Sequence, residues 1–486
     1  MNKNKTNIAK INDIEYMFDI ILANNNNDFV PLSQSSVRML SISDNVFEPF
    51  VDAEMVIDNS LNALQRGFKT SDGRITEASF DFNLYDTDYI FVKLTPILYA
   101  GQNEGDINDE VWTLQYTFAI VDMEDIPSDD PEKKFKRLFL HERDKDIMLR
   151  KTSNFSTSKY VTSTIKPYLR DNEDNMVKTG FALKSMIKEA LTDAEIDPDW
   201  DDGKNDIFYT SPISQTYYDD LLYLYNSHQS AIDSDFCILQ KSRFRDIWKL
   251  NRFSDIVSKA LNQTDKTKSG ELQSETFIIA EGGSTATIPK SRRVPTNYGI
   301  NNNMFFGDLS KLEDYRMVEI SNYDASESIK TTIAHSYDFN DGKFRIEHYD
   351  LADTQTYFTD NYATKLNKPL FKNSTIFKTD TYRLQNRNVA HTYGSLHKAE
   401  NTLEFLSRNK VLQSAYSLNL ALEFTTIGMT HRQAGTFFSI QRENDYVPSE
   451  YENKLQGQWF CMSVQHSFIG ESYTNSIVGV KLNKLE

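Results

Sequence analysis

The sequence predicts an α+β fold that is mostly β, with antiparallel β regions at both ends of the chain and an α-containing region between them. Near both ends apolar and polar residues alternate, which is typical of strands with one solvated face. In the middle, apolar residues recur at three- and four-residue spacing, as on a helix with one buried face. The 486 residues are enough for about three domains of ordinary size.

The first β region begins the chain. Ala53, Met55 and Ile57 alternate with polar neighbours, and the same alternation recurs twice further on. Strands are expected at 51–58, 80–84 and 112–120, with turns rich in Gly, Asn and Asp at 24–27, 71–73 and 101–106. The acidic, proline-containing stretch 126–131 then sets the first boundary.

The middle of the chain changes to helical spacing. The pattern predicts a helix over 181–191, with Thr179 as its N-cap. A second helix is expected after Ser214, followed by strands at 236–239 and 244–250. A polar stretch broken by Gly and Asn at 264–303 is typical of a long insertion or exposed loop.

Alternation returns toward the C-terminus. Strands are expected at 316–320, 344–349, 418–424, 437–440, 460–468 and 473–482. The resulting division is 1–125 for a first β domain, 126–210 for an α/β middle domain, 211–263 for the start of a second β domain, 264–385 for an insertion or accessory domain, and 386–486 for the rest of the second β domain.

Composition excludes several classes of protein. With 53 Lys and Arg against 70 Asp and Glu, the net charge is −17, so nucleic-acid binding is disfavoured. Cys237 and Cys461 are the only cysteines, which fits a reducing cytoplasm and allows neither a disulfide framework nor a cysteine-rich zinc site. We expect no secretory signal and no membrane span.

No motif with known chemistry stands out. The sequence has no nucleophile elbow, P-loop, dinucleotide-binding glycine motif or paired-histidine metalloprotease helix. His391 and His397 are six residues apart, which suits neither one helix face nor a hairpin site, and His466 on a predicted strand is interpreted as a core histidine. The run 338–342 departs from a calcium loop and predicts a turn. We therefore expect no catalytic, cofactor-binding or metal-binding residues, and not an enzyme.

Two basic clusters and many aromatic residues remain to be interpreted. The clusters at 133–137 and 291–293 are short, and such runs usually form solvated faces or pair with acids. The 31 Phe and 25 Tyr could stack on sugars, but most sit at strand-core spacing, which favours burial or subunit packing.

Three segments are informative because of their order. The first is 42–58, in which alternating apolar residues end at Asp58. The second combines the helix at 179–191 with 200–203, 208–212, 219–224, 228–230 and 234–239, and the third is 455–468 with Tyr473 and 480–482. In this order they resemble the central baseplate hub of contractile-tail bacteriophages, a family related in fold to the base of type VI secretion spikes. Residues 265–385 have no counterpart.

The resemblance implies a homotrimer in which each protomer contributes two tail-tube-like β barrels. Three copies would form a pseudo-sixfold ring that adapts the sixfold tail tube to the threefold central spike, with DNA only passing through. The implied partners are the spike protein, the tube protein, baseplate wedge proteins and the tape measure protein. The implied location is the virion tail baseplate, assembled in the cytoplasm of the bacterial host, without stable membrane insertion.

Two other functions stay open at the level of the sequence. One is a tail-associated cell-wall hydrolase, with a carboxylate pair hidden in the unmatched region. The other is a carbohydrate-binding or receptor-binding module at the tail tip, which the aromatic content alone would suggest.

Overall fold

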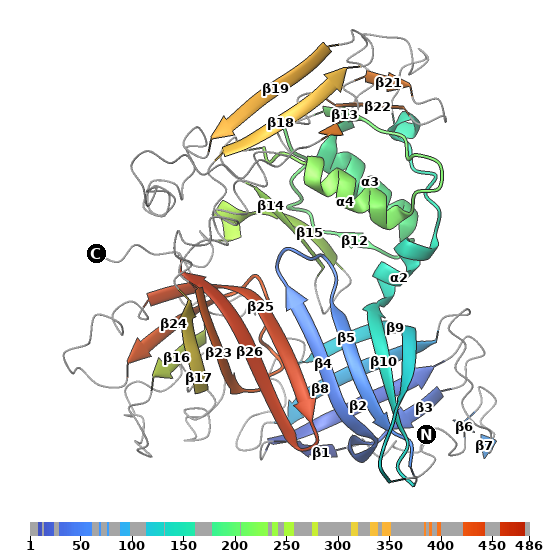
Figure 1. The fold of residues 1–486 in the computed structure, drawn as a ribbon, viewed down its shortest axis with the longest axis vertical. Coiled ribbons are helices and arrows are strands. Elements are labelled where there is room, and N and C mark those ends of the chain that lie inside the picture. Colours follow the sequence, from blue (N-terminus) through green and yellow to red (C-terminus); the bar gives the residue numbers. More distant parts are fainter. Residues whose placement is uncertain are drawn as a thin grey trace. The chain divides into compact units, whose positions relative to one another are not determined.

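A computed structural model gives the fold of the chain (Figure 1). The structure describes residues 8–11, 14–23, 29–60, 68–69, 75–76, 88–97, 113–130, 132–160, 177–204, 206–231, 236–241, 247–256, 275–279, 313–318, 331–338, 343–350, 383–384, 388–390, 396–399, 421–442 and 457–481. These residues are mostly in strands, as the sequence predicted, with few helices. Among them, no helix is both long and apolar enough to cross a membrane.

The chain divides into two compact units. Unit 1 comprises 1–146, 262–317 and 422–479, and unit 2 comprises 147–261, 318–421 and 480–486. Each unit is thus assembled from segments that lie far apart in the sequence. The five-segment division made from the sequence stays a prediction.

Unit 1 is built around one large sheet. Its N-terminal strands are β1 (Ile8–Ile11), β2 (Ile14–Ala23), β3 (Phe29–Leu32), β4 (Val37–Asn45), β5 (Asp52–Asp58), β8 (Tyr89–Ile97), β9 (Leu114–Ile126) and β10 (Phe135–Glu142). Its later strands are β16 (Glu275–Ile279), β17 (Glu313–Val318), β23 (Ala421–Ile427), β24 (Phe437–Arg442), β25 (Gly457–Ile469) and β26 (Ser472–Lys481). A short 3-10 helix, η1 (Gln34–Ser36), precedes β4, and β6 (Phe68–Lys69) and β7 (Ile75–Thr76) form a small separate hairpin.

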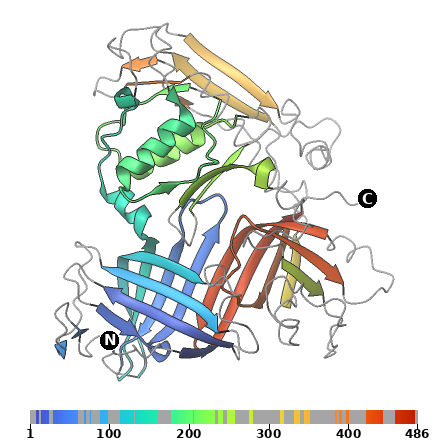
Figure 2. The same ribbon diagram turned by 180° about the vertical axis from the view of Figure 1, so that it is seen from behind.

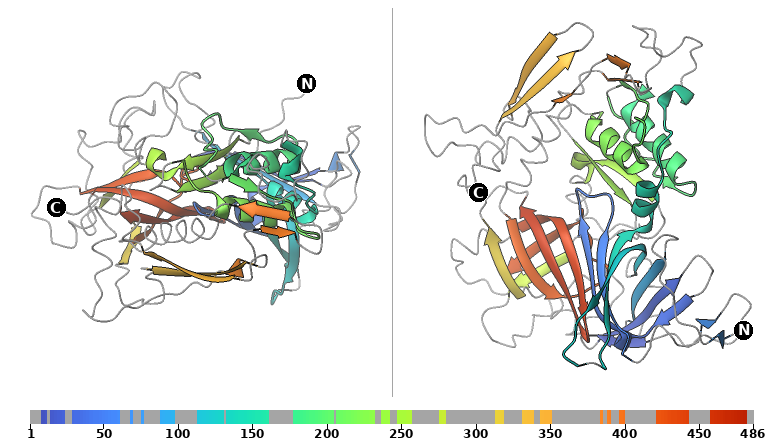
Figure 3. Two further views of the ribbon diagram at one scale, coloured as in Figure 1. Left: turned by 90° about the horizontal axis from the view of Figure 1, so that it is seen from above. Right: turned by 45° about the vertical axis from the view of Figure 1, so that its right-hand side comes forward.

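The sheet runs without interruption from the N-terminal strands to the C-terminal strands. Its order is β1-β2-β8-β9-β10-β5-β4-β25-β26-β23-β17, with β3 on β2, β24 on β25 and β16 on β24. The two groups meet where β4 pairs antiparallel with β25, from Ser463↔Asn45 to Ile469↔Met39. We call this pairing the β4–β25 seam, and Figure 3 (right) shows the C-terminal strands following β4 in one curved sheet.

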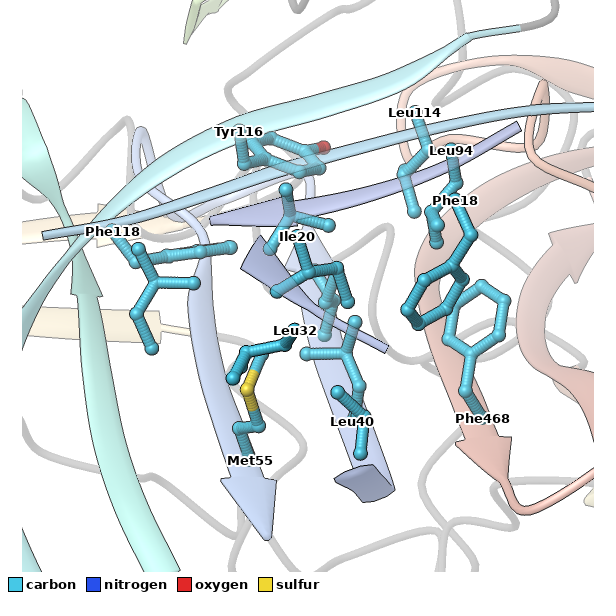
Figure 4. Packing of buried hydrophobic residues seen from close by; sticks show 14 of the residues in the cluster. Phe18, Ile20, Leu32, Leu40, Met55, Leu94, Leu114, Tyr116, Phe118 and Phe468 are labelled. Carbon is cyan, nitrogen blue, oxygen red and sulfur yellow. The ribbon is translucent and has the colours of Figure 1, made fainter. Parts of the chain in front are cut away.

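Side chains from both strand groups share the core of unit 1. On the inner face, Leu40 on β4 lies opposite Met55 on β5, and both are fully buried. Tyr473 from β26 packs edge-on against Tyr16 from β2, with ring centroids 6.1 Å apart. Phe468 from β25 joins the same cluster of buried side chains (Figure 4). Because one core holds both groups, the seam is a packed junction as well as a hydrogen-bonded one.

Strand β25 changes its burial pattern along its length. Trp459, Phe460 and Cys461 are all buried, whereas from Val464 on buried residues alternate with partly exposed ones, as at Val464, His466 and Phe468. The first part of β25 pairs with β24, and the second part pairs with β4. The change from burial on both faces to burial on one face therefore coincides with the change of partner strand.

Unit 2 contains the helices α3 (Thr179–Ala190) and α4 (Tyr217–Ser227), which lie side by side (Figure 2). The other helical segments are η3 (Thr157–Tyr160) and α2 (Arg143–Arg150), which spans the boundary between the units. Its strands are β11 (Val177–Lys178), β12 (Glu195–Ile196), β13 (Asp206–Phe208), β14 (Cys237–Lys241), β15 (Ile247–Arg252), β18 (Thr331–Asp338), β19 (Lys343–Asp350), β20 (Arg383–Leu384), β21 (Asn388–Ala390) and β22 (Leu396–Ala399).

The two predicted helices are confirmed, with one correction at a cap. Helix α4 begins after Thr216, whose side chain accepts from the backbone N–H of Asp219, while the Asp219 carboxylate accepts from the N–H of Thr216. Helix α3 begins at Thr179 itself, so the prediction that Thr179 is its N-cap is wrong. The cap is Lys178, whose side chain makes no capping hydrogen bond.

Several predicted strands are also confirmed. The predicted runs at 51–58, 112–120, 437–440, 460–468 and 473–482 correspond to β5, β9, β24, β25 and β26. Strands β18 and β19 are antiparallel, and their pairing ends at Asp338↔Lys343. This pairing agrees with the turn predicted at 338–342. Residues 339–342 themselves lie outside the described residues. The predicted strand at 80–84 and the predicted turns at 24–27, 71–73 and 101–106 also lie outside the described residues. Within the stretch 264–303, expected as a long insertion or exposed loop, residues 275–279 instead form β16, which pairs with β24 in the large sheet, so the expectation is wrong there. The rest of that stretch, 264–274 and 280–303, lies outside the described residues.

Candidate functional site: the polar face of the large sheet

The histidine singled out on a predicted strand is a core residue. His466 is fully buried, with Nδ1 2.6 Å from the Tyr473 hydroxyl and Nε2 3.1 Å from the backbone oxygen of Arg432. The amide of Asn475 also lies 2.9 Å from His466 Nδ1. The interpretation as a hydrogen-bonded core histidine is confirmed. His391 and the side chain of His397 lie outside the described residues.

The basic cluster at 133–137 pairs with acids, as interpreted from the sequence. Lys136 Nζ lies 2.8 Å from Asp125, and the Arg137 guanidinium lies 2.6 Å from Glu54 and 2.9 Å from Glu124. Because each of these carboxylates lies next to one of the positive charges, the cluster offers little positive surface that could bind phosphate groups. The second cluster, 291–293, lies outside the described residues.

The face of the sheet opposite the core is polar along the seam. In the register, Ser467 lies opposite Ser41 and Gln465 lies opposite Ser43. The residues between them, such as Ile42 and His466, point to the buried side. The Gln465 amide donates to the Ser41 hydroxyl over 2.9 Å, which ties the two strands together at the surface.

The same polarity continues onto the next strands. On β26, Tyr473, Asn475 and Ile477 are buried, so the alternating residues Thr474 and Ser476 share the outer face. On β23, Leu422, Phe424 and Thr426 are buried, so Glu423 and Thr425 face outward. We define the polar face by Ser41, Ser43, Thr425, Gln465, Ser467, Thr474 and Ser476.

Beyond β4, the outer face carries paired charges. Arg137 on β10 lies between Glu54 on β5 and Glu124 on β9, and β5 and β9 are the two strands that pair with β10. Hydrogen bonds from Arg137 to Glu54 and then to Glu124 raise the pKa of the Arg137 guanidinium. The guanidinium also lies 4.9 Å from the ring centre of Phe139.

Two further ion pairs extend this charged part. Lys145 Nζ lies 2.7 Å from Asp52, and Arg38 pairs with Asp58 at 2.5 Å. Partial burial acts to raise the pKa of Asp58, but hydrogen bonds from Ser60 and Arg38 outweigh it and lower that pKa. The Asp58 carboxylate is therefore held in place in its ionised form.

The arrangement suits contact or passage better than reaction. Hydroxyl and amide groups on the polar face can exchange hydrogen bonds with water and carry no charge, and Glu423, beside Thr425 on β23, adds one carboxylate to the same side of the sheet. The charged part pairs each of its named cations with a carboxylate. A polyanion moving along such a face would meet little that attracts it.

Two strands of the sheet have open edges within the described residues. Strand β9 pairs with β8 up to Ala119, and with β10 from Phe118 to Ile126. Within the described part of the chain, β9 beyond Ala119 thus has no partner strand on the side away from β10, although β8, β2 and β1 continue the order from its first part. At the end of the order opposite β1, β17 has only β23 beside it among the described strands. Such edges can pair with another chain.

No family model matches the chain, and no curated protein sequence matches it. Several solved structures are similar in fold. The tail protein from Neisseria meningitidis MC58 matches with a TM-score of 0.45 and 8% identity, over 96% of this chain and 96% of that one. The 43 kDa tail protein of prophage MuSo2 from Shewanella oneidensis matches with a TM-score of 0.43 and 9% identity, over 96% of this chain and 99% of that one.

A chain of a PdpA-VgrG complex is similar as well. In the half-lidded PdpA-VgrG complex of Francisella, one chain matches with a TM-score of 0.45 and 8% identity, over 98% of this chain and 59% of that one. These proteins agree in kind with the resemblance found in the sequence.

Proposed function

We propose that this protein is a structural subunit of a phage tail baseplate, a trimeric hub that adapts a sixfold tail tube to a threefold central spike and forms part of the DNA conduit. The observation that carries the proposal is the β4–β25 seam. It joins the strands of both chain ends into one sheet with a shared core and a polar outer face. A protein that must present two similar wall sections side by side needs such a junction.

The strand order supports the ring geometry. On one side of the seam the nearest four strands are β4, β5, β10 and β9, after which the sheet continues through β8, β2 and β1; on the other side lie β25, β26, β23 and β17. Three chains would provide six such groups, which is the number of subunits in a sixfold tube. The edge of β9 in one chain would pair with β17 of the next, and the ring would close.

Surface chemistry supports the role as a conduit. A wall past which DNA slides should not retain it, and the net charge of −17 disfavours phosphate binding. Charges act within a Debye length of roughly 8 Å at physiological salt, so the surface closest to the DNA matters most. With the polar face lining the channel, the DNA would meet hydroxyl and amide groups at the seam.

The proposal includes the partners and the location. The hub would contact the spike protein, the tube protein, wedge proteins and the tape measure protein, and it would reside in the tail baseplate of the virion after assembly in the host cytoplasm. Its role would be structural, without catalysis. Incubation of the purified protein with peptidoglycan should then release no soluble fragments, and release would favour a cell-wall hydrolase.

The direct test is stoichiometry and symmetry. Native mass measurement of the full-length protein, alone and mixed with its spike and tube proteins, should give three copies per complex. A low-resolution map of that complex should show a threefold ring with six similar wall sections. A stable monomer that binds neither protein would overturn the proposal, and so would a closed ring of any other copy number.

A further inference from the structure

Three buried side chains with metal-binding atoms meet in unit 2. The ligand atoms of Asp201, His228 and Cys237 all lie within 4.8 Å of one another. The residues are 7%, 2% and 5% exposed, respectively. Charged and polarisable groups gathered at such depth call for a physical reason, because burial penalises each ionised group.

Local structure explains how the three residues converge. Asp201 opens a turn in which the N–H of Gly203 donates to Asp201 Oδ1 over 2.7 Å. His228 is the C-cap of α4, and Cys237 is the first residue of β14. These residues come from three separate elements of the same unit, so no short sequence motif marks them.

The glycine in the turn leaves room for the imidazole. Gly203 has φ +81°, and a Cβ on it would lie 2.5 Å from Cε1 of His228. Only a residue without a side chain allows this close approach. The turn is therefore fitted to the histidine as well as to the carboxylate.

The carboxylate is held by donors around it. Ser230 Oγ donates to Asp201 Oδ2 over 3.3 Å, and the N–H of Ala231 lies 3.3 Å from Oδ1. Arg252 Nε lies 3.5 Å from Oδ2. Contacts of this kind orient metal ligands in known sites, and they leave lone pairs of the oxygens available.

The donor set matches one class of metal. Nitrogen, oxygen and sulfur ligands together are typical of zinc, which binds them at about 2.0 to 2.3 Å. His228 Nε2 lies 3.8 Å from Asp201 Oδ1, and all three ligand atoms lie within 4.8 Å of one another, so the side chains would have to close by up to about 1 Å to bind one ion at these bond lengths.

We propose that Asp201, His228 and Cys237 bind one Zn²⁺ per chain, with a water molecule as the fourth ligand. On binding, the Cys237 thiol releases its proton to solvent, and the resulting thiolate bonds to the metal. The ion would fix the turn at Gly203 to the end of α4 and the start of β14. This proposal stands independently of the proposed baseplate function.

Cobalt tests the site because it replaces zinc and reports its ligands by absorption. Full-length protein, freed of metal by a chelator, is titrated with Co²⁺. One equivalent should bind and produce a near-ultraviolet band from thiolate-to-cobalt charge transfer. Cys237→Ser should abolish the band, and His228→Asn should weaken binding by 10-fold or more, by analogy with known sites.

The chain offers a matched control, because Cys461 is its only other cysteine. Cys461→Ser should keep the band unchanged. This variant alone assigns the thiolate to Cys237, even where Cys237→Ser fails to fold. Ser230→Ala should keep the band but weaken binding by about 10-fold, since it removes a donor that orients Asp201.

Two results would overturn the proposal. One is the lack of stoichiometric Co²⁺ uptake by the metal-free wild type, which would leave a hydrogen-bonded cluster without a metal. The other is a thiolate band that is lost in Cys461→Ser. As a second measurement, one equivalent of Zn²⁺ should raise the melting temperature of the wild type while Mg²⁺, which prefers oxygen ligands, should not.

Discussion

Gly203 and Gly470 are a natural pair for comparison, because both have positive φ in very different surroundings. A Cβ on Gly203 would lie 2.5 Å from the His228 ring and 2.8 Å from the backbone oxygen of Gln229. A Cβ on Gly470, at φ +61°, would have nothing within 4 Å. The first glycine is required for packing and backbone conformation, and the second for conformation alone.

We expect Gly203→Ala to lower the free energy of unfolding by about 3 kcal/mol or more, because the clash adds to the backbone strain. Gly470→Ala should lower it by only about 1 to 2 kcal/mol, the cost of the left-handed conformation. Urea denaturation of both variants measures the difference. Equal losses would show that the close approach to His228 does not exist in solution.

Asp220 is a second residue whose surroundings define a measurable property. It is fully buried and accepts hydrogen bonds from the hydroxyls of Ser153, Tyr209 and Ser211, the last two over 2.5 and 3.0 Å. Burial raises the pKa of Asp220 above 3.8, although the three hydroxyls act to lower it. The same burial, together with Asp220, raises the pKa of Tyr209.

The raised pKa of Asp220 predicts a pH dependence. Above pH 3.8, the unfolded chain ionises this carboxyl while the folded chain still holds the proton. The folded state then binds more protons, so this contribution to stability is present below pH 3.8 and is lost as pH rises through the folded pKa. Relative to Asp220→Asn, which cannot ionise, the wild type should lose unfolding free energy over this range.

Denaturant titrations of both proteins at a series of pH values measure this difference, and parallel curves would contradict the assignment. Asp220→Ala provides the companion measurement at one pH. It leaves three buried hydroxyls without their acceptor, and we expect it to cost about 3 to 5 kcal/mol.

Among the elements, α3 and α4 begin in different ways. Helix α4 has a reciprocal cap between Thr216 and Asp219, whereas the N-cap of α3, Lys178, makes no capping hydrogen bond. Thr216→Ala should therefore destabilise the protein by about 1 kcal/mol. Lys178→Ala should cost less than about 0.5 kcal/mol, since it removes only exposed contacts, with the Asp206 carboxylate and the Lys204 carbonyl oxygen. A larger loss at Lys178 would contradict this reading of the two helix starts.

The sequence predicted some strands and missed others, depending on whether one face of the strand is solvated. Strands β5 and β9 have one solvated face and alternate clearly, so the pattern predicted them. Strand β2 carries Met17 and Ile21 on the face opposite Phe18, so its apolar run does not alternate. Strand β10 begins within the basic cluster, where charge concealed the alternation of Leu138 and Leu140. Strand propensity is a property of the local sequence, whereas β2 and β10 owe their burial to the neighbouring strands and side chains that pack on them.

The polar face and the proposed metal site could not be predicted from the sequence, because each brings together residues that are far apart in the chain. The polar face depends on β4 lying beside β25, and no local pattern states that pairing. The group Asp201, His228 and Cys237 is spread over three elements, so it lacks the close spacing that marks familiar zinc motifs. The expectation of no metal ligands relied on that spacing. A useful signal would have been Asp-Asp-Gly next to a predicted helix, because such a turn can aim a carboxylate inward.

At the scale of the whole molecule, the proposed conduit predicts an effect of added charge. The double variant Ser41→Lys with Ser467→Lys places two cations on the polar face. Purified assemblies of this variant should retain duplex DNA at low salt and release it as salt increases, because counterion release makes such binding salt-dependent. Filter binding at several salt concentrations measures the effect.

A control variant with the same added charge tests whether DNA retention depends on where the two lysines lie or only on their number. Asn154→Lys with Ser158→Lys adds two cations at exposed positions of unit 2, which are not part of the polar face. If the polar face lines a channel in a ring, this control should retain less DNA than the first variant. Equal retention by both would argue that the polar face has no special relation to DNA.

The seam also sets an order of events during synthesis. Gln465 and Ser41, which are bonded across it, stand 424 residues apart in the chain. At ordinary elongation speeds, the ribosome needs roughly 20 to 85 s to cover that distance. During that interval the edge of β4 lacks its partner strand. We therefore expect truncated translation products to aggregate with one another. The nascent sheet is completed only when the C-terminal strands have been synthesised.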